Sequence, residues 1–353
     1  MRANALLKTL TDAVLPPPVF DFWAGRLNPL WSRERALASV VARQQEARDT
    51  VTLILRPNRR FQGFAPGQHV NVSVEVDGVR LSRSYSPSQV PGQPGLLAMT
   101  VKRVPGGKVS HWLSDQTPVG SIVELGAAFG DITPAAVTGP ALFLAAGSGI
   151  TPFISLIRAS VAAGMPRPVT LLYWARSEQD LCFAGELQAL ATQWPALGVH
   201  FILTGAGESG SRINKAQLQA LVPSVQQASL FACGPEGFVS TAAGIASTLG
   251  RPFMGEAFTA PVVHWEPGQQ VRVHLARSGK TVSVPAGKPL LQALEDVGLR
   301  PASGCRRGIC NSCACGKREG VTAHVLTQDV QTEPVPSLRI CISSARSDLI
   351  LDL

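Results

Sequence analysis

The sequence predicts three folded domains of different classes: an antiparallel β-barrel, an α/β domain with a parallel sheet, and a small α+β domain. Three observations predict them. Short alternating apolar runs fill residues 36–136, continuous apolar strands alternate with helical stretches over residues 137–258, and a hairpin followed by a helix opens residues 269–353. A chain of 353 residues is also too long for a single hydrophobic core.

Residues 1–35 are expected to form an arm that precedes these domains. Leu6, Leu10 and Val14 have helical spacing, prolines at 16–18 interrupt it, and the aromatic-rich segment FDFWAGRLNPLW follows. Helical spacing interrupted by prolines is typical of a docking segment. The start of the sequence lacks the continuous apolar stretch of a signal peptide, so we expect a cytoplasmic protein.

The charge of the chain bears on its partners. The formal net charge is +8 at pH 7, but Lys and Arg are scattered and aromatic residues make up only 6% of the chain. Nucleic-acid-binding surfaces gather basic residues on one face, so this pattern argues against nucleic acid as a partner. Dispersed positive charge fits an acidic protein, or peripheral contact of residues 1–34 with the anionic inner face of a membrane. No apolar run reaches the length of a membrane-spanning helix, and we expect a soluble monomer.

Five strand sequences make up the predicted barrel. They are LASVVARQ, TVTLILRP, HVNVSVEV, LLAMTVKRV and SIVELGAAF, and PG, DG and GG dipeptides mark the turns. Alternation with short connections is typical of antiparallel strands that bury one face.

The α/β domain and the last domain follow in order. The strands ALFLAAG, VTLLYWA, VHFILTG and SLFACG are continuously apolar, as expected for a parallel sheet that helices such as FISLIRASVAAG cover on both faces. A linker is expected over residues 259–268. The last domain opens with the strands VRVHLA and TVSVPAG and the helix LLQALEDVG.

The last domain carries the segment CRRGICNSCAC, here called the cluster loop (residues 305–315). Cys305, Cys310 and Cys313 have C-x4-C-x2-C spacing, and Cys341 follows 28 positions after Cys313. Ligands of plant-type [2Fe-2S] clusters have this spacing, whereas zinc sites usually show paired C-x2-C knuckles. We therefore predict these four as iron-sulfur ligands, with zinc as the alternative. The remaining cysteine of the loop is expected to be a small buried residue. An odd, clustered set of seven cysteines also indicates a reducing compartment.

Two motifs in the predicted barrel suit a flavin nucleotide. The sequence RSYS, which begins at Arg83, ends an extended segment, and GGKVS begins a helix near Ser110. A guanidinium, backbone N–H groups and the positive end of a helix suit a pyrophosphate. Tyr85 can lie on the flat isoalloxazine ring, and Ser86 can hydrogen-bond to its N5. Taken alone, RSYS also fits a strand with an exposed arginine.

The α/β domain carries a partial nucleotide-binding pattern. The motif GSGITP, with Gly147 and Gly149, follows the first strand, and glycine there lets the backbone approach a phosphate at a helix start. The motif is not GxGxxG, so the dinucleotide fingerprint is only partly met. After the second strand, Arg176 and Ser177 stand where a ribose-binding acid is common, and with Arg212 they could hold a 2'-phosphate. This pattern favours NADPH over NADH, although two acidic residues lie nearby and either arginine could be a surface charge.

One cysteine lies outside the cluster loop in a position of interest. Cys233, in FACGPEGF, stands at the carboxyl end of a later strand, the edge at which open α/β sheets bind ligands. Without the Gly-Pro that follows, a buried cysteine would be the default interpretation.

The order of these motifs resembles the ferredoxin-NADP reductase superfamily fused to a plant-type ferredoxin of β-grasp fold. The resemblance covers about residues 36–353 and implies FAD, NADPH (less readily NADH) and a [2Fe-2S] cluster, with the flavin between a two-electron donor and a one-electron acceptor. The implied FAD contacts are Arg83, Tyr85, Ser86, Lys102, Gly107, Val109, Ser110, Thr151 and Phe258. The implied coenzyme contacts are Gly147, Gly149, Arg176, Ser177, Arg212, Gly234 and Pro235. The residues implied at the reacting rings are Tyr85, Ser86, Cys233 and Glu256.

The segment that begins FDFWAGRLNPLW is further similar to reductases that serve membrane acyl-CoA (stearoyl-CoA-type) desaturases. That resemblance implies electron transfer to a membrane di-iron desaturase; the alternatives are an oxygenase or hydroxylase system, or a non-catalytic protein that holds zinc. Residues 269–353 carry 11 Lys and Arg against 7 Asp and Glu, unlike the acidic photosynthetic ferredoxins. Arg306 and Arg307, inside the cluster loop, are therefore expected to select an acidic partner.

Overall fold

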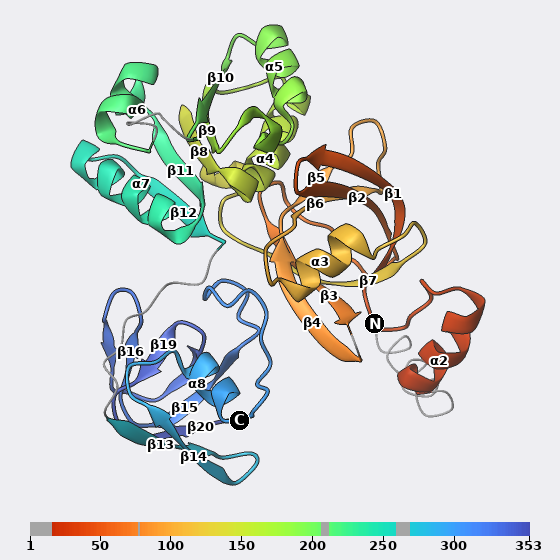
Figure 1. Ribbon diagram of the computed structural model, residues 1–353, viewed down its shortest axis with the longest axis vertical. Coiled ribbons are helices and arrows are strands. Elements are labelled where there is room, and N and C mark those ends of the chain that lie inside the picture. Colours follow the sequence, from red (N-terminus) through yellow and green to blue (C-terminus); the bar gives the residue numbers. More distant parts are fainter. Residues whose placement is uncertain (1–15, 77, 206–211, 259–268) are drawn as a thin grey trace, which may run out of the picture. The chain divides into compact units, whose positions relative to one another are not determined.

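The computed structural model describes residues 16–76, 78–205, 212–258 and 269–353 (Figure 1). Two compact units are present. The described residues up to Cys233 form the first unit with Thr241–Gly255, and Gly234–Ser240 form the second unit with the described part of Glu256–Leu353. Within the described residues, none of the helices has the length and hydropathy needed to cross a bilayer.

A short helix, α2 (Pro17–Leu27), is the first described element. Its first two positions are prolines, whose fixed φ suits the first turn of a helix and whose missing N–H groups would have no partner there. The prolines therefore begin this helix, which the sequence pattern did not predict. The helical pattern expected at Leu6, Leu10 and Val14 lies outside the described residues.

The predicted antiparallel barrel is confirmed. Its strands follow the order β4-β3-β7-β1-β2-β6-β5, and every paired register is antiparallel. Alternate side chains such as Leu53, Leu55, Val70 and Val72 fill its core, as the period-2 pattern requires. The strands are β1 (Leu37–Ala47), β2 (Thr50–Pro57), β3 (His69–Val76), β4 (Val79–Tyr85), β5 (Pro87–Gln89), β6 (Leu97–Lys102) and β7 (Ile122–Phe129); helix α3 (Lys108–Asp115) lies between β6 and β7.

The α/β domain has the predicted sheet, in the order β10-β9-β8-β11-β12, with parallel pairing of β8 to both β9 and β11. Figure 1 shows α4 and α5 on one side of this sheet and α6 and α7 on the other. The strands are β8 (Ala141–Ala146), β9 (Val169–Ala175), β10 (Leu197–Leu203), β11 (Ser229–Gly234) and β12 (Phe253–Ala257). The helices are η1 (Pro134–Ala136), η2 (Gly147–Gly149), α4 (Ile150–Ala162), η3 (Glu178–Asp180), α5 (Ala184–Gln193), α6 (Lys215–Leu221), η4 (Val225–Gln227) and α7 (Glu236–Leu249).

The last domain is the predicted α+β fold. Its main sheet has the order β14-β13-β20-β15-β18, in which β13 pairs antiparallel with β14 and parallel with β20. Helix α8 buries Leu290, Leu291 and Leu294 in the core of this domain. The elements are β13 (Gln270–Leu275), β14 (Lys280–Pro285), α8 (Leu290–Asp296), β15 (Ala314–Glu319), β16 (Thr322–His324), β17 (Val330–Gln331), β18 (Val335–Arg339), β19 (Ser343–Ala345) and β20 (Leu349–Leu351).

Candidate functional site

The end of strand β4 places the RSYS motif at the edge of the barrel. Tyr85 pairs with Val70 of β3, and Ser86, directly after the strand, is buried. Burial raises the pKa of the Tyr85 hydroxyl, and the guanidinium of Arg83 opposes part of that shift. Arg83 itself is exposed and donates from Nη1 to the Ser82 carbonyl at 2.7 Å. The motif thus presents a shielded aromatic ring with a cation beside it, which suits a flavin nucleotide.

The turn before helix α3 is shaped as an anion site. Ser110 Oγ donates to the Gly107 carbonyl at 3.0 Å and accepts from the Val104 N–H at 3.2 Å, so the hydroxyl closes the turn. A Cβ at Gly107 would lie 2.5 Å from Ser110 Oγ, which explains the glycine. No side chain caps the start of α3, so its first N–H groups can bind a phosphate oxygen. Val109 is buried behind the turn, and Lys102 ends β6 half-buried.

The carboxyl edge of the parallel sheet holds the nicotinamide candidates of the first unit. Gly147 follows β8 with φ of +55°, and the space a Cβ would occupy there is open to 4 Å. Gly149 precedes α4, whose N-terminus no side chain caps. Thr151 is buried and donates to the Ser148 carbonyl at 3.0 Å, and Cys233 is buried at the end of β11. An open glycine turn at an uncapped helix start fits a dinucleotide pyrophosphate.

The predicted 2'-phosphate residues lie at the end of β9, and the structure adds one that the sequence analysis missed. Arg176 is exposed, and Ser177 Oγ donates to Asp180 at 2.7 Å. Arg48, in the turn between β1 and β2, donates from Nη2 to Ser177 Oγ at 3.1 Å. A lone arginine in a turn carries no sequence signal, so only the tertiary contact reveals it. Arg212 is exposed before α6.

Four predicted residues fall in the second unit. Gly234 ends β11 and Pro235 follows it, Glu256 is buried in β12, and Phe258 directly follows β12. The Phe258 N–H donates to the Gly234 carbonyl at 3.0 Å, which brings the two segments together.

A polar joint fastens the barrel to the α/β domain inside the first unit. Arg158 of α4 forms two hydrogen bonds of 2.7 Å with Glu186 of α5. Its Nη1 also donates to Ser88 Oγ at 2.9 Å and to the Gln89 carbonyl at 2.8 Å, both on β5. We call these four residues the barrel joint. Nothing in the sequence pattern distinguished Arg158 from a surface arginine.

The cluster loop turns its backbone donors toward sulfur. The Arg307 N–H lies 3.3 Å from Cys305 Sγ, and the Gly308 N–H lies 3.2 Å from Cys341 Sγ. The Cys310 N–H lies 3.4 Å from Cys305 Sγ. Such N–H···S contacts are what an iron-sulfur cluster requires of its loop.

The four thiols approach one another in two pairs. Cys305 shares a hydrogen bond with Cys310, and Cys313 shares one with Cys341. In each pair the hydrogen bond lowers the pKa of one thiol, that of Cys310 or Cys313, and raises the pKa of its partner. Among the described residues, no group of three or more potential ligands is arranged around a single metal ion. Two pairs fit the two irons of a [2Fe-2S] cluster better than one tetrahedral zinc ion.

The arginines of the cluster loop make hydrogen bonds within the second unit. Arg306, with φ of +59°, forms two hydrogen bonds of 2.7 and 2.6 Å with Glu295 of α8. Arg307 donates to the Ala257 carbonyl at 2.6 Å. Both guanidiniums therefore have partners within this unit, and their selection of an acidic partner stays a prediction.

The remaining cysteine of the loop, Cys315, points into the core of the domain from β15. Burial, followed by the charges of Cys313 and Asp352, raises its thiol pKa to about 12. A buried, protonated thiol is a poor metal ligand, as expected for a residue outside the ligand spacing.

The arm carries a cluster of exposed apolar side chains. Phe22, Trp23 and Trp31 are 55%, 60% and 52% exposed, and Leu27 is 82% exposed. The guanidinium of Arg26 lies 4.6 Å from the centre of the Phe22 ring. We call these five residues the arm surface.

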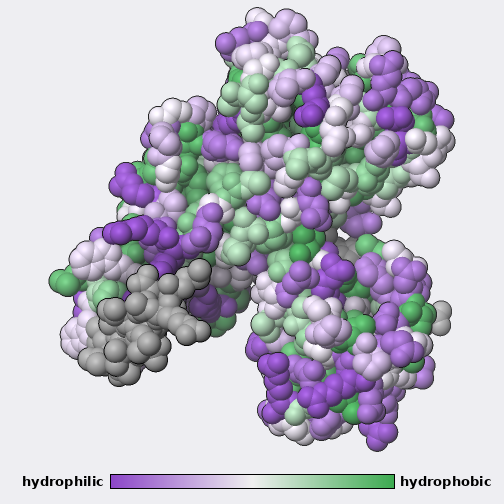
Figure 2. Space-filling view, turned by 180° about the vertical axis from the view of Figure 1, so that it is seen from behind, coloured by the Kyte–Doolittle hydropathy of each residue, from purple (hydrophilic) through white to green (hydrophobic). Residues whose placement is uncertain are grey.

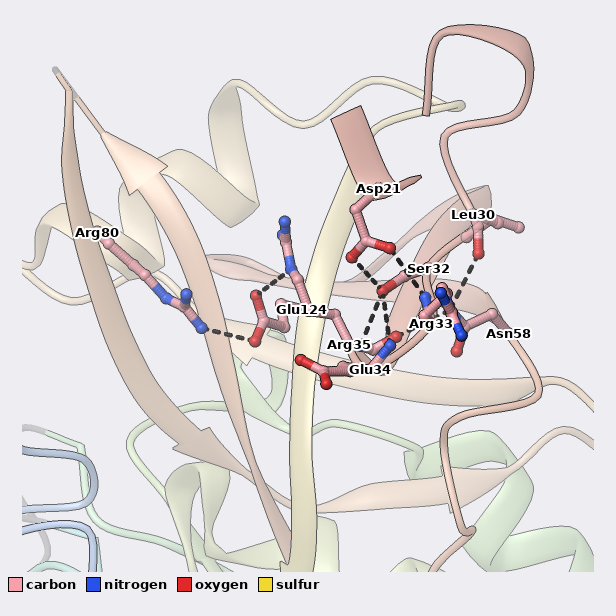
Figure 3. A network of polar contacts seen from close by, with 9 residues as sticks. All are labelled: Asp21, Leu30, Ser32, Arg33, Glu34, Arg35, Asn58, Arg80 and Glu124. Atoms are coloured by element: carbon pink, nitrogen blue, oxygen red, sulfur yellow. Dashed lines mark hydrogen bonds and ion pairs between the residues drawn. The ribbon is translucent and has the colours of Figure 1, made fainter. Parts of the chain in front are cut away.

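Polar contacts fasten the arm to the barrel (Figure 3). Asp21 accepts from Ser32 Oγ at 2.6 Å and from the Arg33 N–H at 2.9 Å. Asn58, which follows β2, donates to the carbonyls of Leu30 and Arg35, each at 3.0 Å. These hydrogen bonds hold the arm in place, so the side chains of the arm surface are exposed within a fixed conformation of the chain.

Three family models match the chain in the order of its domains. The model of the oxidoreductase FAD-binding domain matches residues 37–133, that of the oxidoreductase NAD-binding domain residues 143–244, and that of the 2Fe-2S iron-sulfur cluster binding domain residues 273–345. These matches confirm the predicted FAD, NAD(P)H and [2Fe-2S] cofactors and leave the zinc alternative without support.

Related proteins match along nearly the whole chain. An NADPH oxidoreductase of Mycobacterium tuberculosis is 32% identical over 98% of this chain and 92% of its own length. The glycine betaine monooxygenase reductase subunit of Pseudomonas aeruginosa is 29% identical over 92% of this chain and 98% of its own length. The solved structure of phthalate dioxygenase reductase has the same fold, with a TM-score of 0.61 and 24% identity over 90% of this chain and 97% of that one.

Proposed function

This chain belongs to the ferredoxin-NADP reductase superfamily, in the branch that carries a C-terminal [2Fe-2S] domain, and we propose that it is the reductase component of an oxygenase-type system. It is an NAD(P)H-dependent oxidoreductase with FAD and a [2Fe-2S] cluster. The observation that carries the proposal is the order of the three domains, which is shared along most of the chain with a monooxygenase reductase subunit. Bound FAD turns the hydride of the coenzyme into single electrons, which the cluster can pass on.

The residues of the chain would bind, orient and shield the flavin and the coenzyme. Tyr85 and Ser86 would cover the flavin, while the uncapped start of α3 after Gly107 would hold its pyrophosphate. The glycine turn at Gly147 would hold the coenzyme pyrophosphate, and Cys233 would close the coenzyme site from the end of β11. None of these roles requires a catalytic acid or base.

Four cysteines would hold the cluster in two pairs, Cys305 with Cys310 on one iron and Cys313 with Cys341 on the other. The support is the pairing of the thiols and the backbone N–H groups that point at their sulfurs. A lowered thiol pKa in each pair favours the thiolate that binds metal.

The coenzyme would be NADPH. Arg176 is exposed at the carboxyl edge of the sheet, and Arg48 and Ser177 beside it offer further donors to a phosphate. A 2'-phosphate is the only group that separates NADPH from NADH, so the effect of these residues on the two coenzymes tests the assignment.

The test compares the KM for NADPH and for NADH with an artificial electron acceptor. Arg176→Ala should raise the KM for NADPH about tenfold, because a charge-assisted hydrogen bond to phosphate is lost, and should leave the KM for NADH nearly unchanged. Arg167→Ala is the matched control, since Arg167 is also exposed but precedes β9 at the opposite edge of the sheet. Equal effects of Arg176→Ala on both coenzymes would rule out the 2'-phosphate role.

A second candidate acceptor, a membrane acyl-CoA desaturase, is favoured by the arm surface. Exposed Trp and Phe beside arginine suit the interface of an anionic membrane. In this version the arm would hold the reductase at the inner face of the membrane.

Binding to vesicles that contain phosphatidylserine separates the two candidates. The double substitution Phe22→Ser and Trp23→Ser should abolish the binding, whereas Val119→Ser, at an exposed position of the barrel outside the arm, should not change it. If the unmodified protein does not bind, the desaturase version fails and the oxygenase proposal stands.

A further inference from the structure

The peptide group between Gly308 and Ile309 is held at its carbonyl end. Its carbonyl oxygen accepts a hydrogen bond from Nη1 of Arg339, the last residue of β18. Its N–H, on Ile309, lies between the Arg307 and Cys310 N–H groups, which are 3.3 and 3.4 Å from Cys305 Sγ. Because the peptide is trans, its C=O and N–H point in opposite directions, so the N–H points away from the guanidinium.

Gly308 has little freedom to adopt another orientation. Its φ is +76°, and a Cβ at this position would lie 2.2 Å from Cδ1 of Ile342. Its own N–H donates to Cys341 Sγ at 3.2 Å. An N–H that points at a cluster sulfur therefore stands directly before the Gly308 carbonyl, and Arg339 is the side chain that fastens this carbonyl.

We propose that Arg339 is a positioning residue that raises the reduction potential of the [2Fe-2S] cluster through the Gly308–Ile309 peptide. A cation on a carbonyl oxygen polarises the peptide and makes its N–H a stronger donor. Stronger N–H···S contacts stabilise the reduced cluster, which carries one more negative charge than the oxidised cluster. Arg339 is exposed and does not bind the cluster, so its effect is on the donor strength and orientation of the peptide.

Arg306 plays a different part because its charge is balanced. The carboxylate of Glu295 accepts a hydrogen bond from each terminal nitrogen of Arg306, so the pair adds little net charge near the cluster. Within the described residues, no carboxylate is paired with Arg339. Its charge therefore acts on the loop carbonyl without an opposing anion.

The test is a dye-coupled redox titration of the purified holoprotein, with the reduced cluster followed by electron paramagnetic resonance. Arg339→Met should shift the ratio of oxidised to reduced cluster about tenfold toward the oxidised form at a given potential, which for one electron is about 59 mV lower. Iron analysis of each sample confirms equal cluster content.

The matched control is Arg346→Met. It removes the same charge from an exposed position five residues after Cys341, where the side chain donates to Gln328 and not to the loop. This variant should shift the ratio less than about twofold, since its guanidinium is not hydrogen-bonded to the cluster loop and its charge is screened by solvent. Equal shifts in Arg339→Met and Arg346→Met would mean that the potential responds only to the net charge of the domain, and would overturn the proposal.

Arg339→Gln keeps the proposal testable if Arg339→Met incorporates too little iron. Its shorter neutral side chain should also lower the potential. A loaded Arg339 variant with the potential of the unmodified protein would overturn the proposal. The titration uses neither NADPH nor a protein acceptor, so its result is independent of the proposed coenzyme and partner.

Discussion

The barrel joint and the cluster loop are each held by a bidentate arginine–glutamate pair, but the two pairs are built differently. Arg158 has a side chain only 13% exposed, and besides Glu186 it binds a hydroxyl and a carbonyl of β5. The side chain of Arg306 is 34% exposed and binds a helix of its own domain, 11 positions away in sequence. Arg158 therefore joins two domains through its bonds to β5, whereas Arg306 only holds a loop against a helix of the same domain.

This difference indicates where each half of the protein obtains its stability. The joint is complete without a cofactor, because all four of its bonds come from the chain. The cluster loop instead presents backbone donors to sulfur atoms, and such contacts gain their full strength only with metal-bound thiolates. We infer that the barrel joint keeps its stability without a cofactor, whereas the stability of the cluster loop depends on its metal.

The largest expected effect comes from removing a ligand. Cys310→Ser should abolish the cluster, since one iron would lose a thiolate, while flavin reduction by NADPH continues. Visible absorbance and electron paramagnetic resonance measure both outcomes. Cys315→Ser is the control in the same loop, and it should retain the cluster because its side chain lies in the core. Loss of the cluster in both variants would contradict the assignment of ligands.

The second effect tests the barrel joint. Arg158→Met should destabilise the first unit by about 3 kcal/mol, because Glu186 is left with a half-buried charge and two polar groups of β5 lose their partner. Thermal release of flavin measures this change. Bleaching of the cluster, which belongs to the second unit, should keep its midpoint. Equal shifts of both transitions would show that the two units do not unfold separately.

The third and smallest effect tests the Arg306–Glu295 pair of the cluster loop. Arg306→Met should destabilise the second unit by about 1 kcal/mol, because its pair is partly exposed and local. Cluster bleaching should then occur at a lower temperature while flavin release is unchanged. A loss as large as that of Arg158→Met would mean that the loop depends on this pair as much as the joint depends on its own.

Local patterns predicted the classes of the three domains because period and turn residues act over a few positions. The same locality explains one omission, since prolines that break a helix from within also begin one, and the helix that starts at Pro17 was not predicted. The residues of the barrel joint could not be predicted. Arg158 and Ser88 are 70 positions apart and meet only in the folded chain.

In the cluster loop, too, short-range spacing was predictive and tertiary contacts were not. Its spacing placed three cysteines and Cys341 in one candidate set, and the surplus cysteine outside it. The spacing gave no information on contacts within the fold, so it did not predict that Arg306 binds Glu295. Hydrophilic side chains cover much of the second unit (lower right in Figure 2), and a sequence does not distinguish the paired ones from the free ones.

Anaerobic titration with NADPH tests the central claim, that electrons from the coenzyme pass through the flavin to the cluster within one chain. The flavin band and the resonance signal of the reduced cluster are followed together. We predict that the flavin band bleaches and that the cluster signal appears in the unmodified protein, and that only the bleaching occurs in Cys310→Ser. A reduced flavin without any cluster signal in the fully loaded, unmodified protein would contradict the claim.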